Sequence, residues 1–406
     1  MQVSTPSSAR RPTHFAGLPV SGAALRTEAK IWWREVDRVL LLLILLLMAF
    51  GALGVSAGSP ASAARLSTAQ EQLPPLYFFY RHLAWVMLGI ATMIGVSALP
   101  RTSVRRGGVI LGAAMIGALF LVPLIGSEVN GARRWLDLGI RFQPSEFLKP
   151  AFAILLGWIV SWRLRDRALP VVALSVVLTG LVVMLLMLQP NLGGAILFAG
   201  AWLVVAMLAG LPMQRIAMAG AGGLTALTAT YFLYDNARNR IDAFLGGGEA
   251  FGQVDLAART LQGGGWGGTG MRLGIEKMRL PEAHTDYVFS VIGEEFGLIT
   301  CALIVLLYLA IVLRALVRLM EEEDLFATLA GAGLVALFGG QAFINMLVNL
   351  QLFPSKGMTL PLVSYGGSST IAQCITIGAL LALTRRNPFL DRSRFDWRAL
   401  LPERGR

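Results

Sequence analysis

Cysteine and histidine are scarce in this chain of 406 residues, which contains two cysteines and three histidines. Two cysteines cannot build a network of disulfides, and both Cys301 and Cys374 lie inside apolar stretches. The histidines, His14, His82 and His284, are far apart in the sequence, and no cysteine lies at a metal-ligand spacing from them. The sequence therefore predicts no structural metal site.

Charge is also scarce: 15% of the residues are charged, whereas 55% are hydrophobic and occur in long unbroken blocks. A helix of about 20 apolar residues crosses the ~30 Å hydrocarbon core of a bilayer. The blocks predict an all-α polytopic membrane protein with about ten transmembrane helices of this length. The predicted spans lie near residues 36–57, 77–98, 108–126, 146–162, 169–188, 192–210, 215–234, 286–313, 325–350 and 362–384.

The formal net charge of +11 is distributed along the chain in a way that argues against nucleic-acid binding. Basic residues gather at the ends of predicted spans, for example Arg105 and Arg106, or Arg314 and Arg318. Such clusters in alternate loops are typical of the cytoplasmic side of a membrane protein. This pattern predicts that both termini are cytoplasmic and that a large external loop, residues 235–285, joins helices seven and eight.

The two ends of the chain differ from its middle. Residues 1–35 are rich in Ser, Pro and Arg and are predicted to form a disordered cytoplasmic tail. The transmembrane domain covers residues 36–386, and residues 387–406 form a C-terminal cytoplasmic tail.

Loop 235–285 contains the glycine run Gly263–Gly268, which resembles a phosphate-binding loop only superficially. No P-loop Lys-Ser/Thr pair follows it, so a nucleotide site is excluded. Glycine here permits tight turns and close backbone approach, and Leu256, Leu261 and Leu273 are expected to dip into the headgroup region. The loop is a candidate lid.

Strongly polar residues within or beside a span commonly mark a cavity or a site. The first such group surrounds Arg133, Arg134 and Lys149. One interpretation is an interfacial loop in which Glu146 and Lys149 form a local ion pair. The other is a cationic patch that binds an anionic headgroup such as a diphosphate.

A second group, Asp286, Ser290 and Glu294, has the spacing of one helical face. Asp286 precedes an apolar run, where a carboxylate often caps a helix. The alternative is an acid that faces a water-filled cavity.

A third group begins with Gln341, Asn345 and Asn349, again spaced four apart. It leads to Lys356 in an external loop and then to a run of small polar residues that includes Ser368. Packing between helices explains such a stripe equally well. Together, the three groups predict a water-accessible cavity with one acid and several cations on the external side.

The same segments resemble the SEDS family (shape, elongation, division and sporulation). Four motifs carry the resemblance, over about residues 36–386: Asn130-Gly-Ala-Arg-Arg-Trp135, Gln143-Pro-Ser-Glu146, Pro281-Glu-Ala-His-Thr-Asp286 followed by Gly293-Glu-Glu-Phe-Gly297, and Lys356-Gly-Met-Thr through Ser369. The segment that begins at Lys356 is more similar to the cell-division branch, FtsW, than to the rod-shape branch, RodA.

The resemblance implies a ten-helix peptidoglycan glycosyltransferase that polymerises lipid II in the bacterial inner membrane, at the division septum. It also implies a class B penicillin-binding protein and other divisome membrane proteins as partners. Within the motif Pro281–Asp286, the resemblance assigns the role of essential acid to Asp286.

The expected chemistry needs one base, because a diphosphate leaves as an anion, whereas a poor alkoxide leaving group needs a second carboxylate as its acid. We expect Asp286 to be the general base. The cations Arg133, Arg134, Lys149 and Lys356 would stabilise the diphosphate. The other residues expected to bind substrate are Glu294, Asn345 and Ser368.

Neither a metal ligand set nor a cofactor motif is evident, although a divalent cation, Mg²⁺ or Mn²⁺, is compatible with the chemistry. Two rival functions stay open at this point: a transporter that flips lipid II, since broken helices with charges also occur in carriers, and a non-catalytic divisome scaffold.

Overall fold

The computed structural model describes residues 22–129, 132–137, 139, 141–164, 169–233, 238, 242, 249–354 and 357–386. Its regular elements are, in chain order, α1 (Gly22–Glu35), α2 (Arg38–Leu66), α3 (Tyr77–Ala98), α4 (Arg101–Ile125), β1 (Ser127–Val129), β2 (Ala132–Asp137), β3 (Arg141–Phe142), α5 (Pro144–Ser161), η1 (Trp162–Leu164), α6 (Val171–Met187), α7 (Leu192–Leu208), α8 (Met213–Leu233), α10 (Glu249–Gly263), η2 (Glu276–Met278), α11 (Val288–Met320), α12 (Leu325–Asn349) and α13 (Gly367–Leu383).

The chain divides into two units, of which one contains α1 and the other spans Val36–Arg385. The prediction that the N-terminal tail lacks regular structure is wrong for Gly22–Glu35, which forms α1. This stretch is rich in Ala, Leu, Arg, Glu and Lys, which favour helix, whereas the Ser and Pro that suggested disorder lie mainly before it. Residues 1–21 and 387–406 are outside the described residues.

The larger unit is a bundle of apolar helices, which confirms the predicted fold class. Each predicted span overlaps one helix, namely α2 to α8 and α11 to α13. Five of these, α2, α3, α4, α11 and α12, are long and apolar enough to cross a membrane, and α6, α7 and α13 are shorter apolar helices. The number of crossings and the side on which the termini lie stay predictions.

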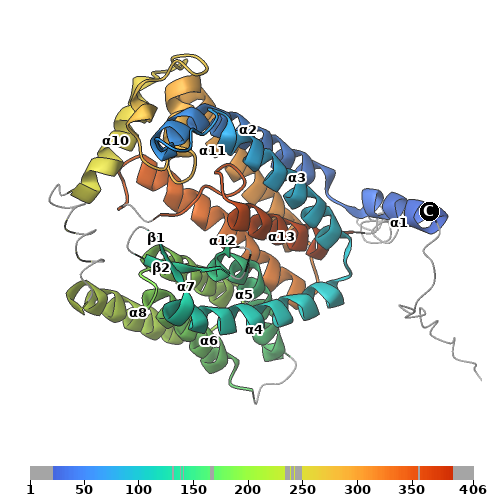
Figure 1. The fold of residues 1–406 in the computed structure, drawn as a ribbon. Coiled ribbons are helices and arrows are strands. Elements are labelled where there is room, and N and C mark those ends of the chain that lie inside the picture. The colour runs from blue at the N-terminus through green and yellow to red at the C-terminus, as the bar shows by residue number, and fades with distance from the viewer. Residues whose placement is uncertain are drawn as a thin grey trace, which may run out of the picture. The chain divides into compact units, whose positions relative to one another are not determined.

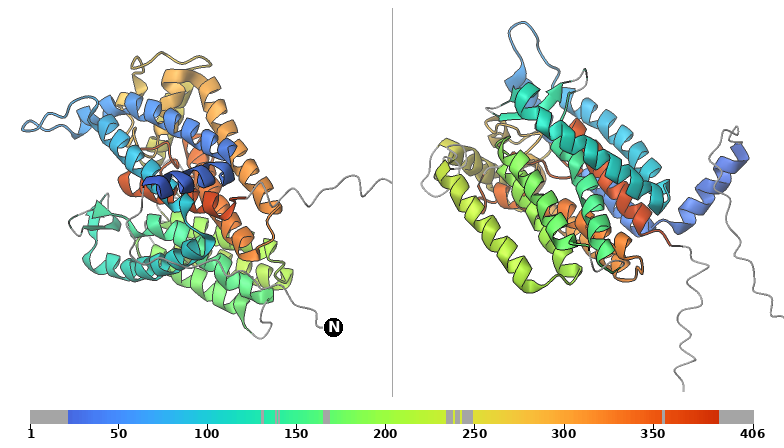
Figure 2. Two further views of the ribbon diagram at one scale, coloured as in Figure 1. Left: turned by 90° about the vertical axis from the view of Figure 1, so that its right-hand side faces the viewer. Right: turned by 90° about the horizontal axis from the view of Figure 1, so that it is seen from below.

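Helices that are distant in the sequence pack side by side in this unit. The final helix, α13, lies against α3, and α12 lies against α5 (Figures 1 and 2). Small residues allow close approach between helices in a membrane. At Gly157 of α5, for example, an added Cβ would be 2.5 Å from the backbone nitrogen of Ala330 in α12. Any larger residue there would push these two helices apart.

A small antiparallel sheet with the strand order β1-β2-β3 interrupts the helices between α4 and α5. Ser127 pairs with Trp135 across β1 and β2, and Leu136 pairs with Phe142 across β2 and β3. The sequence was expected to form only helices and loops, so this sheet was not predicted. Its consequence is that side chains in the arginine-rich segment alternate between two faces.

Residues 249–285, the longest described part of the predicted external loop, are folded onto the bundle. Helix α10 packs against α11. Leu261 is buried, and an added Cβ at Gly293 would be 2.2 Å from its side chain. Leu256 packs against a buried apolar cluster. The expectation that Leu256 and Leu261 enter the headgroup region is therefore wrong, because both pack against protein, whereas Leu273 is exposed.

At the opposite end of α11, an ion-pair cluster joins two helices. The side chain of Asp37 accepts hydrogen bonds from the backbone N–H groups of Val39 and Leu40 and so caps α2. The same carboxylate accepts a hydrogen bond from Arg314 Nε at 2.8 Å and another from Arg318 Nε. These contacts tie the start of α2 to the end of α11.

Candidate active site

Asp286 lies in a turn, residues 281–287, that leads into α11. The helix begins at Val288, and its N-cap residue is Tyr287, whose side chain makes no capping hydrogen bond. The expectation that Asp286 shares a helical face with Ser290 and Glu294 is therefore wrong, because Asp286 is outside the helix. The N-cap position that a structural interpretation would assign to Asp286 is occupied by Tyr287.

Two amides of α12 hold the backbone of this turn. Asn345 Nδ2 donates to the carbonyl of Asp286 at 2.8 Å and to the carbonyl of Met358 at 2.6 Å. Asn349 Nδ2 donates to the same Asp286 carbonyl at 3.2 Å, while its Oδ1 accepts from Ser290. The predicted polar stripe on α12 thus positions Asp286 through main-chain hydrogen bonds.

The segment before α13 supports the turn from another side. Ser364 Oγ donates to the carbonyl of Thr285 at 2.6 Å, and the backbone N–H of Tyr365 donates to the carbonyl of His284 at 2.9 Å. His284 Nδ1 and Ser62 Oγ are 2.6 Å apart. Burial lowers the pKa of His284 to about 4, against the opposing effect of Glu282, so its imidazole is neutral at pH 7. Sequence reasoning missed these supports because each joins distant segments.

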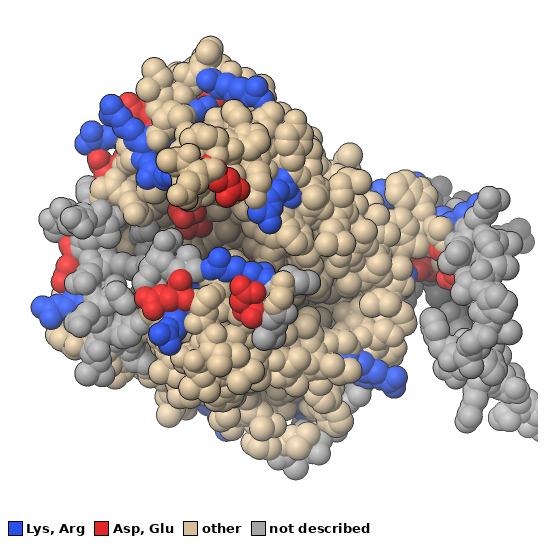
Figure 3. All heavy atoms as spheres, in the orientation of Figure 1, with Lys and Arg blue, Asp and Glu red and all other residues tan. Residues whose placement is uncertain are grey.

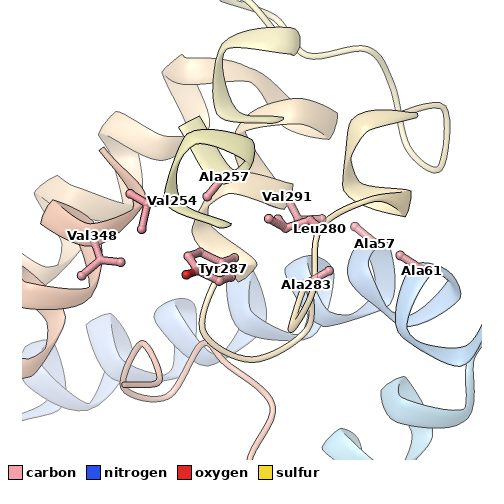
Figure 4. Close-up of a cluster of buried hydrophobic side chains, with 9 residues drawn as sticks. All are labelled: Ala57, Ala61, Val254, Ala257, Leu280, Ala283, Tyr287, Val291 and Val348. Carbon is pink, nitrogen blue, oxygen red and sulfur yellow. The ribbon is translucent and has the colours of Figure 1, made fainter. Parts of the chain in front are cut away.

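Apolar packing also holds the turn that contains Asp286 in place. Tyr287 is buried in a cluster that draws side chains from α2, α10, α11, α12 and the turn itself (Figure 4). Its members are Ala57, Ala61, Val254, Ala257, Leu280, Ala283, Tyr287, Val291 and Val348. Since Asp286 precedes Tyr287, its backbone is held both by packing and by hydrogen bonds.

The two predicted arginines of β2 have different surroundings because neighbouring residues of a strand face opposite sides. Arg133 is exposed and pairs with Glu128 at 3.6 Å. Arg134 Nε donates to the carbonyl of Gln189 at 3.2 Å, and its Nη2 donates to the carbonyl of Pro190. Only Arg134 is therefore directed toward the interior.

Gly357 lies close to both Arg134 and Asp286. An ideal Cβ built on this glycine would lie 3.5 Å from Asp286 Oδ2 and 3.7 Å from Arg134 Nη1. These two atoms consequently cannot be farther apart than the sum of those distances. The glycine has a φ of +61° and is exposed, so an acid and a guanidinium group both lie close to an exposed backbone position.

Lys149 of α5 is buried and lies in a different environment from Arg134. Its Nζ donates to Glu146 at 2.6 Å and to Gln341 Oε1 at 2.7 Å. Gln341 also accepts from Gln373 and donates to the carbonyl of Thr359. The Glu146–Lys149 pair that the local interpretation predicted is present. A substrate role for Lys149 stays a prediction, since its ammonium group has these partners within the chain.

Glu294, another of the predicted substrate residues, has its partners in a distant segment of the chain. Both carboxylate oxygens of Glu294 accept backbone hydrogen bonds, from Glu276 N at 2.7 Å and from Lys277 N at 3.0 Å. These contacts are structural, and they give no support to substrate binding by Glu294. Ser368 is buried in the first turn of α13, and Lys356 lies outside the described residues.

Figure 3 shows one face of the molecule hollowed, with basic and acidic side chains at the border of the hollow. Within the described part of the chain, no three His, Cys, Asp or Glu side chains are grouped so as to hold a metal ion. The arrangement suits a reaction in which one carboxylate takes a proton while a guanidinium group stabilises negative charge.

Comparison with known proteins places this geometry in a family. The model for the FtsW, RodA and SpoVE proteins, described as "Cell cycle protein", matches residues 38–388. The chain belongs to this family. The resemblance seen in the sequence motifs is confirmed, and the match includes every helix from α2 to α13.

Curated relatives in this family are similar over most of their length. A probable peptidoglycan glycosyltransferase FtsW of Caulobacter vibrioides is 36% identical over 365 residues, which cover 89% of this chain and 93% of the relative. A protein of the same name from Halorhodospira halophila is 34% identical over 375 residues, with the same two coverages. These names agree with the predicted cell-division branch.

Solved structures of the family share the fold. A chain of a peptidoglycan synthase complex, studied for the coordination of polymerization and crosslinking, has a TM-score of 0.69 and 29% identity, covering 89% of this chain and 99% of that one. The rod shape determining protein RodA of Thermus thermophilus has a TM-score of 0.64 and 28% identity, covering 87% and 97%.

Proposed function

We propose that this membrane protein is a peptidoglycan glycosyltransferase that polymerises lipid II during cell division. Its relatives from Caulobacter vibrioides and Halorhodospira halophila are named for this activity. The fold is shared with a chain of a peptidoglycan synthase complex. The single observation in the molecule that carries the proposal is the proximity of both Asp286 and Arg134 to Gly357.

In this reaction the 4-hydroxyl of an acceptor N-acetylglucosamine attacks the anomeric carbon of a donor N-acetylmuramic acid. Asp286 takes the hydroxyl proton as the new carbon–oxygen bond forms. The bond to the polyprenyl diphosphate breaks with inversion, and Arg134 stabilises the negative charge on the leaving group. Arg134 is suited to this because its Nε and Nη2 are anchored on two carbonyls, which fixes the direction of the guanidinium plane.

Preorganisation supports the assignment of Asp286 as base. A catalytic group is effective when it does not have to be ordered at the moment of reaction. The Asp286 carbonyl accepts from two amides of α12, and Tyr287 is buried beside it. These contacts hold the backbone of Asp286 in place before substrate binds.

The proposal extends to location and partners. We assign the Asp286 end of the bundle to the outer face of the bacterial inner membrane at the septum. A class B penicillin-binding protein would cross-link the glycan strands, and other divisome membrane proteins would join the assembly. The relatives' names and the synthase complex support this assignment.

One structural feature favours the rival function of a lipid II transporter. Helix α11 is broken at Gly297, which has non-helical φ and ψ angles, and broken helices are common in carriers. In this protein, however, residues 264–270 occupy the break and bond to its exposed backbone groups. A filled break is less suited to alternating access.

A polymerisation assay tests the proposal. Purified protein, with a penicillin-binding partner whose transpeptidase site is inactivated, receives fluorescent lipid II in detergent. We expect glycan chains of many units with the parent protein and none with Asp286→Asn. Movement of lipid II across liposomes without polymer formation would establish the transporter, and neither activity would favour the divisome scaffold.

A further inference from the structure

The break in α11 creates a docking place for part of the long segment between α8 and α11. The backbone N–H of Leu298 donates to the carbonyl of Gly265, and that of Ile299 donates to Trp266. In the other direction, the N–H groups of Thr269 and Gly270 donate to carbonyls of α11.

Glycine is required for this approach. An added Cβ at Gly297, where φ is +83°, would be 2.2 Å from the carbonyl oxygen of Trp266, and one at Gly264 would be 2.0 Å from that of Gly293. The segment from Gly264 to Met278 is thus built into the side of α11.

The two halves of α11 differ in their surroundings. From Val288 to Glu295 every residue is buried, whereas beyond Gly297 the apolar side chains of Ile299, Leu303 and Leu306 are exposed. Exposed leucine and isoleucine along a transmembrane helix face lipid. The break therefore separates a protein-covered half from a lipid-facing half.

Helix length places the break at the edge of the membrane. The 33 residues of α11 extend about 50 Å at a rise of 1.5 Å per residue, which exceeds the ~30 Å of hydrocarbon. Arg314 and Arg318 mark one boundary, since arginines gather at helix ends. A span of about 20 residues before them ends near Gly297.

The segment beside the break presents a row of exposed apolar side chains. Trp266 is 75% exposed, Leu273 68% and Ile275 73%, and Met271 and Met278 are also exposed. We call these five residues the Trp266 surface. Trp266 adjoins Ile299, which is 64% exposed and belongs to the lipid-facing half of α11. The surface therefore continues the lipid-facing side of the bundle.

Several polar groups in and beside this segment have partners within the protein, which favours contact with lipid. Glu294 accepts from the backbone N–H groups of Glu276 and Lys277. Lys277 pairs with Glu295, and both side chains are buried. The charges that remain exposed nearby are largely basic: Arg272, Arg279 and Arg65, the last of which donates to the carbonyl of Arg279.

A cavity adjoins the same segment. It has a volume of about 470 Å³ and lies between residues 272–278, Pro60 of α2, and Pro75 and Leu76 at the end of the α2–α3 connection. Its walls are mainly apolar, with Arg272 among them. The apolar walls are suited to an acyl chain, and the guanidinium group of the arginine is suited to a phosphate.

We propose that the Trp266 surface inserts into the membrane interface and binds anionic phospholipid, with the phosphate at Arg272 and acyl carbon against Leu273 and Ile275. A tryptophan at headgroup level and basic residues near anionic lipid are the usual anchors of such a segment. The predicted external loop is then partly an interfacial segment, and the base at Asp286 is linked to it through α11. The proposal does not depend on which reaction the protein catalyses.

Spin-label accessibility tests it in the full-length protein, reconstituted in vesicles of phosphatidylethanolamine and phosphatidylglycerol. A nitroxide label is attached to the variants Leu273→Cys and Ile275→Cys, since both positions are exposed. The natural cysteines, Cys301 and Cys374, are buried and should not react with the label. Ile299→Cys is the lipid control and Gln72→Cys, in an exposed connection, is the water control.

The measured quantity is the ratio of label collisions with oxygen to label collisions with a water-soluble nickel complex. We expect labels at positions 273 and 275 to give the same high ratio as the label at position 299. The label at position 72 should give a lower ratio. A ratio at 273 and 275 equal to that at Gln72 would overturn insertion and leave the surface to a protein partner. For the headgroup, Arg272→Glu should shift the 273 label toward water only in vesicles that contain phosphatidylglycerol. An equal shift in pure phosphatidylcholine would overturn the anionic contact at Arg272.

Discussion

Two aspartates at opposite ends of α11 show how the same side chain can serve structure or chemistry. Asp37 places its carboxylate against two backbone N–H groups and two arginines, so its charge is used to hold α2 and α11 together. At Asp286 the hydrogen bonds from α12 are to the backbone carbonyl, and Oδ2 lies 3.5 Å from the position that a Cβ on Gly357 would take. The difference teaches that the position of Asp286 depends on hydrogen bonds to its backbone, which a change of its carboxylate leaves in place, whereas the role of Asp37 depends on the carboxylate itself.

The largest expected effect comes from Asp286→Asn. An amide keeps the size of the side chain but cannot accept the hydroxyl proton, so the polymerisation rate should fall by about 10²–10⁴-fold, the usual contribution of a general base. Thermal unfolding in detergent should be unchanged. Gel analysis of glycan products measures the rate, and parental activity in this variant would remove Asp286 from the mechanism.

A smaller loss is expected from Asn345→Leu, which leaves the backbone near Asp286 without one of its amide donors. The carbonyls of Asp286 and Met358 lose a hydrogen bond each, and misplacement of the base should lower kcat more than it raises KM. Steady-state kinetics at varied lipid II concentration separates the two.

Asn349→Leu, which removes the longer 3.2 Å bond to Asp286, is the matched comparison and should affect kcat less. If Asn345→Leu changes KM alone, the amide binds substrate and does not position the base.

Arg134→Lys sharpens the comparison within β2. Lysine retains the charge but not the planar group held on the carbonyls of Gln189 and Pro190, so kcat/KM should fall by about 10-fold, or about 1.4 kcal/mol. Arg133→Lys is the control, since Arg133 is exposed and pairs with Glu128; its activity should be unchanged. Equal effects of the two substitutions would show that the segment acts only as an interfacial anchor.

Asp37→Asn should alter stability and leave the chemistry intact. Asparagine can still cap α2, but the charge-assisted bonds from Arg314 and Arg318 are lost, at a cost of about 1.5–3 kcal/mol. The midpoint of thermal unfolding measures this.

Asp324→Asn provides the control, because Asp324 caps α12 and has no salt bridge among the described residues. If Asp324→Asn lowers the stability as much as Asp37→Asn does, the effect of Asp37 is due to helix capping and not to its ion pairs.

The smallest effect is a dependence of stability on pH. Burial raises the pKa of Asp37, but the hydrogen bonds from Arg318, Arg314 and the backbone outweigh it and hold the pKa below its ordinary 3.8. A carboxyl whose pKa is lowered by folding stabilises the protein above the unfolded value, and this contribution is lost as the pH falls through the lower folded value. Unfolding midpoints measured down to acid pH should therefore decline less steeply in Asp37→Asn than in the parent.

The order of the helices follows from the sequence alone, because a block of about 20 apolar residues has few alternatives to a membrane-spanning helix. The motifs around Arg134 and Asp286 identified the family in the same way, and Asp286 was singled out as the acid. A signal of this kind can be recognised in the sequence because all of its residues lie within one short segment.

Tertiary structure alone decided which of the polar residues meet. Asp286 and Arg134 both lie near Gly357, and Asn345 joins Asp286 to Met358, although these segments are far apart in the sequence. The arginine pair of β2 looked equivalent in sequence, but strand pairing turned Arg133 and Arg134 to opposite faces. Glu294, expected in a cavity, binds the backbone of a distant segment instead. Such outcomes depend on which surfaces pack together, and the free energy that selects them comes from contacts between elements that no local pattern encodes.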